Sequence, residues 1–111
     1  MWNEPSPEQL GKIPRLYETE MIPGQDKLIY LHFFMLGSDW YVAEYDGQDI
    51  FFGFAVLNND YQNAEWGYLS FTELREIRVH GVEADCELDW DPRPAREIPQ
   101  IQKYYQIMKT V

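Results

Sequence analysis

The residues best suited to chemistry are a set of carboxylates that lie close to aromatic residues. Glu44 and Glu65 each fall in a short apolar run that is typical of a strand. Paired carboxylates on neighbouring strands can perform acid/base catalysis or hold Mg²⁺, provided that one pKa rises or a metal neutralises both charges. Trp40 and Trp66 would line the sides of such a site, where their rings could stack on a base or a sugar. The candidate pocket comprises His32, Asp39, Trp40, Glu44, Asn63, Glu65 and Trp66.

A structural interpretation of the same residues competes with the catalytic one, and we favour it. Aspartate and asparagine commonly serve turns and strand ends, while Trp and Tyr fill small cores. His32 has no second histidine at metal-ligand spacing, so a core or pocket-lining role is expected rather than metal binding. Ser38 and Ser70 lack the glycine context of a nucleophile. No cofactor is predicted. A divalent metal ion is expected only if the paired carboxylates belong to a small metal-assisted hydrolase, which is the alternative function considered below.

A second pattern is a run of alternating acids between residues 83 and 91. As one strand, this run would place five carboxylates on one face, about 6.6–6.8 Å apart, a spacing close to that of phosphates along a nucleic-acid strand. The alternative is that charges on an exposed edge strand prevent sheet-to-sheet aggregation. The five acids are Glu83, Asp85, Glu87, Asp89 and Asp91, and the predicted binding surface adds Glu44, Asp46 and Asp49.

The charge of the whole chain limits the partners that it can take. Nineteen acids against nine bases give a formal net charge of −10 over 111 residues. Such a surface repels phosphate, so direct nucleic-acid binding is disfavoured, whereas basic proteins are attracted. Solubility alone would also explain much of this excess.

The single cysteine and the absence of long apolar runs predict a reducing, cytoplasmic compartment. Cys86 cannot form an internal disulfide, which favours a reducing environment, and its place on the apolar side of the acidic run predicts a buried thiol. No stretch approaches the ~20 apolar residues of a membrane span, and the first residues do not resemble a signal peptide. We therefore expect a cytoplasmic protein that makes no membrane contact.

The elements that must position these residues are predicted to form a small antiparallel sheet. Strands are predicted over residues 27–35, 40–45, 50–56 and 65–69, with the acidic run as a further strand. Asp46-Gly47 predicts a two-residue hairpin turn between the second and third strands.

A few short helices complete the predicted fold. Ser6 and Ser70 each begin a pattern that is typical of a capping box, and Pro99 suits the first turn of a last helix. We predict one α+β domain over residues 1–111, with a short helix and irregular arm in residues 1–15 and a helix in residues 96–110.

Several motifs together resemble a known family. They include Gly37-Ser38-Asp39-Trp40-Tyr41 and Asn63-Ala64-Glu65-Trp66-Gly67-Tyr68, with further matches at residues 16–20, 26–27, 32–34, 43–47, 51–53, 57–58 and 73–74. In these motifs the chain is similar to the bacterial domain of unknown function 2958, whose members are small proteins of plasmids, phages and integrative elements. The resemblance covers about residues 10–95. It implies a mobile-element setting near antirestriction genes, and it implies no established activity.

These observations predict a protein that acts by binding. We expect an accessory or counter-defence protein whose acidic surface occupies the basic, nucleic-acid-binding face of a host protein. The alternatives are a small metal-assisted hydrolase or nucleic-acid-processing enzyme that uses Asp39, Glu44 and Glu65, and a dimeric structural module without a ligand. Convergence of the carboxylates in a pocket would favour the enzyme, and an exposed row of acids would favour the binding protein.

Overall fold

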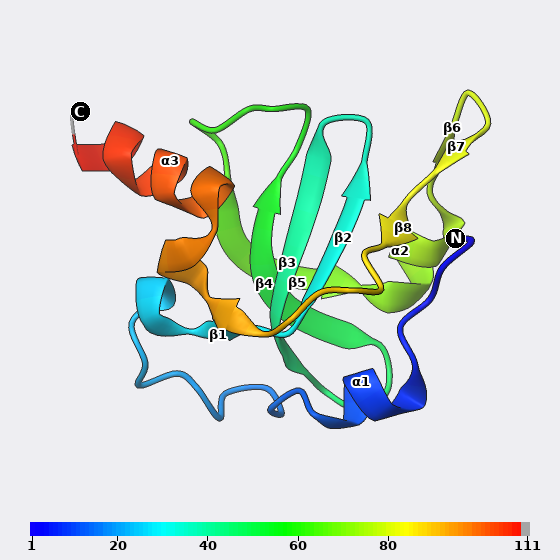
Figure 1. The fold of residues 1–111 in the computed structure, drawn as a ribbon, viewed down its shortest axis with the longest axis horizontal. Coiled ribbons are helices and arrows are strands. Elements are labelled where there is room, and N and C mark those ends of the chain that lie inside the picture. The colour runs from blue at the N-terminus through cyan, green and yellow to red at the C-terminus, as the bar shows by residue number, and fades with distance from the viewer. Residues whose placement is uncertain (110–111) are drawn as a thin grey trace.

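The computed structural model describes residues 1–109, and its centre is a five-stranded antiparallel sheet (Figure 1). The strand order is β5, β4, β3, β2, β8. These strands are β2 (Leu31–Met35), β3 (Ser38–Tyr45), β4 (Ile50–Val56), β5 (Glu65–Ser70) and β8 (Asp85–Cys86). Two short pairs flank the sheet: β1 (Leu28–Ile29) with β9 (Arg93–Pro94), and β6 (Arg78–Val79) with β7 (Val82–Glu83). The predicted α+β fold is confirmed.

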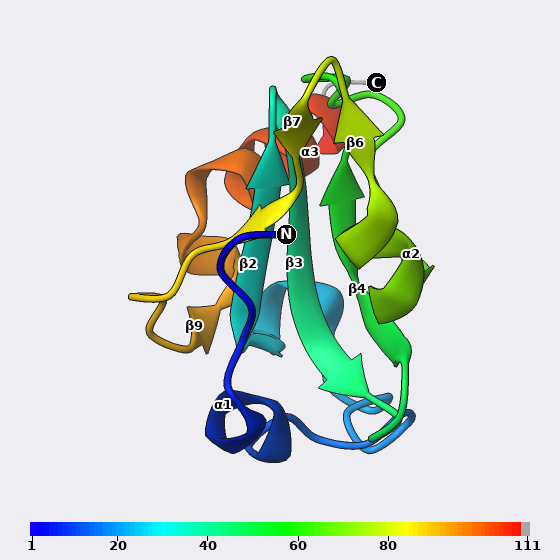
Figure 2. The ribbon, with the colours of Figure 1, turned by 90° about the vertical axis from the view of Figure 1, so that its right-hand side faces the viewer.

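Helices cover both faces of this sheet (Figures 1 and 2). They are α1 (Pro7–Gly11), α2 (Phe71–Glu76) and α3 (Pro99–Lys109), with 3-10 turns η1 (Gly24–Asp26) and η2 (Ala95–Glu97). Phe71 and Leu74 of α2 pack with Phe33, Val42 and Phe51 on one face. The other face carries a second core, formed by Ile29, Tyr41, Ala43, Phe54, Val56, Ala64, Ala95, Ile98 and Ile101. We call these two faces the α2 face and the α3 face. Strand β3 is buried throughout because both faces are covered.

The predicted helix starts at Ser6 and Ser70 are confirmed. The Ser6 hydroxyl accepts the Gln9 backbone N–H at 3.1 Å, and the Gln9 side chain accepts the Ser6 N–H at 2.8 Å, which completes a capping box. Ser70 likewise accepts the Glu73 N–H, at 3.1 Å, at the start of α2. The last helix begins at Pro99, three residues later than the predicted residue 96, because residues 95–97 form η2. Residue 110 of the predicted helix lies outside the described residues.

A β-bulge in β3 distinguishes it from a regular strand. Val42 pairs with Gly53 while Glu44 pairs with Phe52, so Ala43 is the extra residue. The backbones approach so closely here that a Cβ on Gly53 would lie 2.1 Å from the Tyr41 carbonyl oxygen. Glycine at this position is therefore a requirement of the sheet.

The predicted two-residue turn at Asp46-Gly47 is wrong. The connection between β3 and β4 spans residues 46–49, and the Asp46 carboxylate accepts the backbone N–H groups of Gln48, Asp49 and Ile50 at 2.7, 2.8 and 3.0 Å. An aspartate that satisfies three successive backbone donors stabilises a wider loop than a type I′ turn allows.

The prediction of one acidic strand over residues 83–91 is also wrong. Within this segment β7 ends at Glu83, and only Asp85–Cys86 pairs with β2. Beyond Cys86 the chain turns, since the Trp90 N–H bonds the Glu87 carbonyl at 3.3 Å. Leu88 is half exposed instead of buried. The alternation predicted a strand, but the Trp90 indole anchors the turn by donating to the Ile29 carbonyl at 2.9 Å.

Candidate functional site

The predicted pairing of Glu44 with Glu65 does not occur. Residues that lie directly opposite each other in an antiparallel sheet project from the same face, and the face alternates along a strand. Glu44 pairs with Phe52 and Glu65 pairs with Ala55, three positions further along β4. The two carboxylates therefore project from opposite faces of the sheet and cannot share a proton or a metal ion.

Glu44 has a structural role on the α3 face. Its carboxylate is buried and accepts the backbone N–H groups of Tyr17 at 2.9 Å and Thr19 at 3.0 Å, and also the Thr19 hydroxyl. The ammonium of Lys27 reaches the same segment, where it bonds the Thr19 carbonyl and hydroxyl. This network holds the irregular arm that precedes the sheet against β3.

The remaining members of the predicted pocket are also separated. Trp40 belongs to the core of the α2 face, while Trp66 lies on the α3 face and donates its indole N–H to the Tyr105 hydroxyl at 2.9 Å. Asn63 lies in the loop before β5, where it bonds the Asp60 carboxylate at 2.7 Å. Only His32 and Asp39 of the predicted set come into contact.

The charged cluster that does form is centred on His32. Its Nε2 lies 2.7 Å from an oxygen of Asp39, and its Nδ1 lies 2.7 Å from an oxygen of Glu87. The second Asp39 oxygen accepts the side-chain N–H of Gln100, from α3, at 2.8 Å. One imidazole thus joins β2, β3, α3 and the segment after β8.

Aromatic rings enclose the imidazole of His32. Tyr41 stacks on it with ring centroids 4.6 Å apart, and Trp90 lies at 5.3 Å. Burial, followed by the nearby charge of Asp39, raises the pKa of the Tyr41 hydroxyl far above its ordinary value. Tyr41 is therefore a neutral stacking partner at physiological pH.

The geometry of this cluster determines its chemistry. Each ring nitrogen of His32 lies within hydrogen-bond distance of a carboxylate oxygen, so both nitrogens are engaged within the molecule. Moreover, within residues 1–109 no three His, Cys, Asp or Glu side chains are grouped to hold a metal ion. The cluster is an imidazole fixed between two carboxylates from different segments.

A shallow hollow of about 510 Å³ opens beside this cluster, and we call it the hairpin hollow. Its polar side is formed by His32, Asp39 and Glu87, and its remaining lining is Phe34, Met35, Leu36, Gly37 and Ser38. Leu36 and Phe34 present large apolar side chains to solvent, with 63% and 42% of their surface exposed. A carboxylate floor beside an apolar rim suits a ligand that is both cationic and apolar.

The turn that carries this rim is strained. Leu36 has a φ of 40°, followed by Gly37 at 83°, so both turn residues adopt the left-handed conformation of a type I′ hairpin. Glycine and asparagine adopt this conformation readily, whereas a bulky leucine does so at a cost. The turn is held by the Asn59 N–H, which bonds the Gly37 carbonyl at 2.9 Å, and by the Asn58 N–H on the Ser38 hydroxyl at 3.0 Å.

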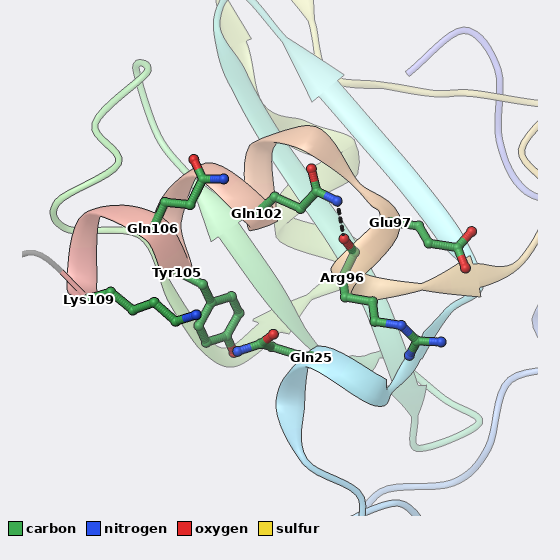
Figure 3. Close-up of a pocket in the computed structure, with 7 residues that line it drawn as sticks. All are labelled: Gln25, Arg96, Glu97, Gln102, Tyr105, Gln106 and Lys109. Atoms are coloured by element: carbon green, nitrogen blue, oxygen red, sulfur yellow. Dashed lines mark hydrogen bonds between the residues drawn. The ribbon is translucent and has the colours of Figure 1, made fainter.

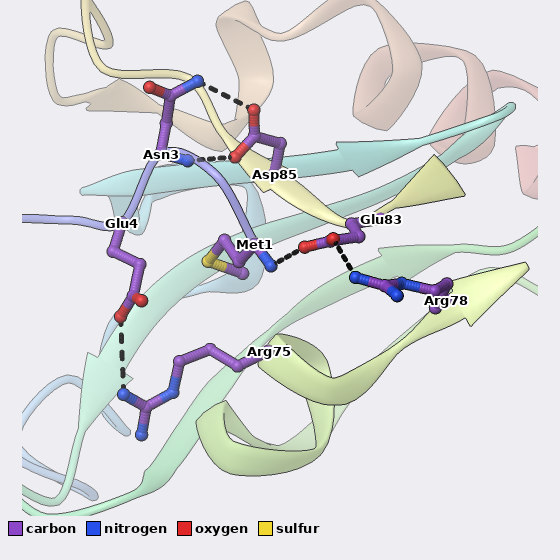
Figure 4. Close-up of polar contacts among 7 residues, drawn as sticks. All are labelled: Met1, Asn3, Glu4, Arg75, Arg78, Glu83 and Asp85. Atoms are coloured by element: carbon purple, nitrogen blue, oxygen red, sulfur yellow. Dashed lines mark hydrogen bonds and ion pairs between the residues drawn. The ribbon is translucent and has the colours of Figure 1, made fainter. Parts of the chain in front are cut away.

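Three of the five acids in the run of residues 83–91 have partners within the molecule, and Figure 4 shows two of them, Glu83 and Asp85. Glu83 binds the amino group of Met1 and, at 2.5 Å, Arg78, and these hydrogen bonds lower its pKa below the ordinary value. Asp85 accepts two bonds from Asn3, at 2.6 and 2.8 Å. Glu87 is the partner of His32, and of the five acids only Asp89 and Asp91 are exposed.

Asp46 and Asp49, which lie in the loop between β3 and β4 and belong to the predicted binding surface, also stabilise the fold. Asp46 holds its own loop, as described above. Asp49 accepts the Ser70 hydroxyl at 2.6 Å and the Thr72 N–H and hydroxyl at 2.7 and 2.6 Å, so it stabilises the start of α2. These bonds, that of Ser70 first, lower the pKa of Asp49 below its ordinary value. Cys86 is buried as predicted, and burial raises the pKa of its thiol to about 12.

A second hollow of similar volume lies between η1 and α3 (Figure 3). Its lining mixes carboxamides with opposite charges: Gln25, Arg96, Glu97, Gln102, Tyr105, Gln106 and Lys109. Arg96 is paired with Asp26 at 3.0 Å, and Gln102 bonds the Arg96 carbonyl. We see no convergent charge or nucleophile here, and we therefore regard the hairpin hollow as the better candidate site.

Comparison of the chain with models of known families, with curated proteins and with solved structures gives no match. The similarity to the domain of unknown function 2958 therefore stays a prediction. None of the helices in residues 1–109 has the length and hydrophobicity needed to cross a membrane.

Sequence reasoning identified the members of the His32 cluster only in part. His32 and Asp39 were assigned to a pocket and Glu87 to the acidic strand, and Gln100 was missed. The contact between Gln100 and Asp39 spans 61 residues, and no local spacing in the sequence indicates it.

Proposed function

We propose that this protein acts by binding a basic segment of another protein, with the hairpin hollow as the point of docking. The observation that supports this best is the juxtaposition of Glu87 and Asp39 with the exposed, strained Leu36. The bound segment would insert an arginine or lysine toward the carboxylates and lay an apolar side chain on the rim.

The charge of the cluster supports a cationic ligand. Two carboxylates, those of Asp39 and Glu87, flank the single imidazole of His32. Asp39 has both oxygens engaged, but Glu87 uses one oxygen for His32, and its side chain is 42% exposed. The other Glu87 oxygen is therefore the available acceptor for a charge-assisted hydrogen bond. The overall charge of −10 would speed the encounter with a basic partner.

The counter-defence setting belongs to this proposal and rests on the resemblance described above. In that setting the partner is a host protein whose basic, nucleic-acid-binding face is covered. The row of acids in residues 83–91 no longer supports phosphate mimicry, since three of its members have internal partners. The binding surface that we propose is instead the hairpin hollow itself, whose lining includes Glu87 but neither Asp89 nor Asp91.

The test uses the purified protein as bait in a host lysate at low and high salt, together with two variants. Glu87→Gln removes the charge at the hollow but keeps an acceptor for His32. Asp89→Asn removes the same charge from an exposed position without a partner in the described structure. We expect one or more basic proteins to bind the wild type and Asp89→Asn at low salt, to elute at high salt, and to bind Glu87→Gln weakly.

Purified recovered protein should then show a slower association rate with Glu87→Gln and a steep salt dependence with the wild type. Equal recovery of basic proteins by both variants would show that the hollow is not the docking point. Failure to enrich any basic protein would contradict the proposed function itself.

A further inference from the structure

A third, smaller hollow of about 190 Å³ lies on the α3 face and shares no residue with the hairpin hollow. We call it the tyrosine hollow. It is lined by three aromatic rings and three charged groups: Tyr17, Phe52, Tyr68, Glu20, Lys27 and Glu44. Tyr17 and Tyr68 are 62% and 58% exposed, so their rings face solvent although they border a cavity.

The rings of this hollow are held in fixed positions. Phe52 and Tyr68 are paired across β4 and β5, with ring centroids 5.2 Å apart and planes at 59°. Tyr17 has a φ of 73°, which is an unfavourable conformation for a bulky residue. Glu44 maintains it by accepting the Tyr17 N–H at 2.9 Å. Strain of this kind persists only where the surroundings impose it, and it is concentrated at ligand sites.

The charges of the hollow favour a cation. Glu20 and Glu44 outnumber Lys27. The Glu20 backbone N–H bonds the Tyr17 carbonyl at 3.2 Å, while its carboxylate accepts no hydrogen bond and forms no ion pair among the described residues. Of the three rings, Phe52 is already in contact with Trp66, which stacks on it at 5.8 Å, and with Lys27, so Tyr17 and Tyr68 supply the ring surface that a ligand would contact. The Lys27 ammonium lies 5.9 Å from the centroid of the Phe52 ring, within the range of a cation–π interaction.

We propose that the tyrosine hollow binds a quaternary ammonium group, as found in choline or in a trimethylated lysine. A primary ammonium would need several acceptors, but the Glu44 oxygens already accept from Tyr17 and Thr19. A quaternary ammonium forms no N–H bonds and is stabilised by ring faces and a nearby carboxylate. This site does not depend on the basic partner proposed above.

The experiment is a titration of the whole protein with choline chloride, in which NMR chemical shifts are measured at each step. A parallel titration with sodium chloride at equal ionic strength is the reference for non-specific salt effects. The uncharged analogue 3,3-dimethylbutan-1-ol has the same shape without the positive charge. We expect saturable shifts at Tyr17, Phe52 and Tyr68 with choline, with a dissociation constant on the order of 1 mM, and no saturable shift with the analogue. Trimethyl-lysine within a short peptide tests the other source of the same group, and tighter binding than choline would identify a peptide ligand.

Three variants test the residues. Tyr68→Leu removes a ring from an exposed strand position and should weaken choline binding by roughly tenfold, while Tyr68→Phe keeps the ring and should bind nearly as the wild type does. Glu20→Gln should weaken binding several-fold. Glu65→Gln removes an exposed charge from β5, the strand that carries Tyr68, at a position outside the hollow. It should leave choline binding unchanged.

The proposal is overturned if choline gives no saturable shift or if the uncharged analogue binds equally well. It is also overturned if Tyr68→Leu and Glu20→Gln both bind choline as the wild type does. None of these results bears on the hairpin hollow, because its test uses a protein partner and the Glu87→Gln variant.

Discussion

At the scale of single residues, the structure assigns new roles to side chains that the sequence marked as chemical. Glu44 is a buried acceptor for the backbone of the arm, and Glu87 is a partner of His32. Leu36 has the opposite character, because it is an exposed leucine held in the left-handed conformation. These three residues therefore give the most direct tests of structure against function.

Leu36→Asn should stabilise the protein and weaken its binding. Asn-Gly is the preferred pair for a type I′ turn, so the substitution relieves backbone strain while it removes the apolar rim. We expect the free energy of unfolding to rise by about 0.5–1 kcal/mol in urea denaturation. Binding of the basic partner should fall. A variant with lower stability would show that Leu36 packs more productively than its exposure indicates.

Glu44→Gln should destabilise the fold by about 1–3 kcal/mol, because a buried acceptor of three donors becomes partly a donor. Glu65→Gln, which changes an exposed glutamate on the other face, should alter stability by less than about 0.5 kcal/mol. Urea denaturation of both variants measures the difference. Equal effects would contradict the separate environments of the two glutamates.

At the scale of elements, close backbone contact and side-chain caps determine how the sheet and helices join. The bulge in β3 brings the Tyr41 carbonyl against Gly53, and Asp49 ties the β3–β4 loop to the start of α2. The close contact at Gly53 predicts that stability responds to an added side-chain atom. The hydrogen bonds of Asp49 predict that stability responds to pH.

Gly53→Ala should destabilise the protein by about 1–3 kcal/mol or prevent folding, because its Cβ would overlap the Tyr41 carbonyl. Gly67→Ala is the matched control, since a Cβ on this β5 residue meets nothing within 4 Å. We expect Gly67→Ala to leave stability unchanged or slightly raised in thermal denaturation. Similar melting temperatures for the two variants would exclude the close approach.

Acid should remove the stabilisation that Asp49 provides. Its folded-state pKa is lowered from 3.8, chiefly by the Ser70 hydroxyl, so the folded protein binds fewer protons than the unfolded chain. The contribution is therefore fully present above pH 3.8 and is lost as pH falls through the lower folded value. Denaturation at pH 7, 5 and 3 should show a shallower acid loss for Asp49→Asn than for the wild type. Parallel curves would contradict this role.

At the scale of the whole molecule, acidic residues outnumber basic ones, while both faces of the central sheet are covered by packed side chains. Nineteen acids face nine bases, and both faces of the central sheet are covered. Surface ion pairs such as Arg75–Glu4 and Arg96–Asp26 contribute at most about 1 kcal/mol each. Repulsion among the surplus carboxylates should therefore be the larger electrostatic effect on stability.

Sodium chloride should consequently raise the urea midpoint at pH 7. At physiological ionic strength charges are screened beyond about 8 Å, which weakens repulsion across the surface more than contacts within hydrogen-bond distance. The same salt should slow the association with a basic partner. A midpoint that falls as salt is added would show that attractive pairs dominate the surface.

The sequence by itself determined the α+β class, most of the central strands and the helix starts, because these depend on local alternation and capping. It also determined the acidic charge and the burial of Cys86. Only the tertiary structure decided which acids meet. The bulge and the pairing register placed Glu44 and Glu65 on opposite faces, and the turn after β8 brought Glu87 to His32. Register and long-range contacts depend on how distant segments pack together, and alternation within one segment cannot specify them.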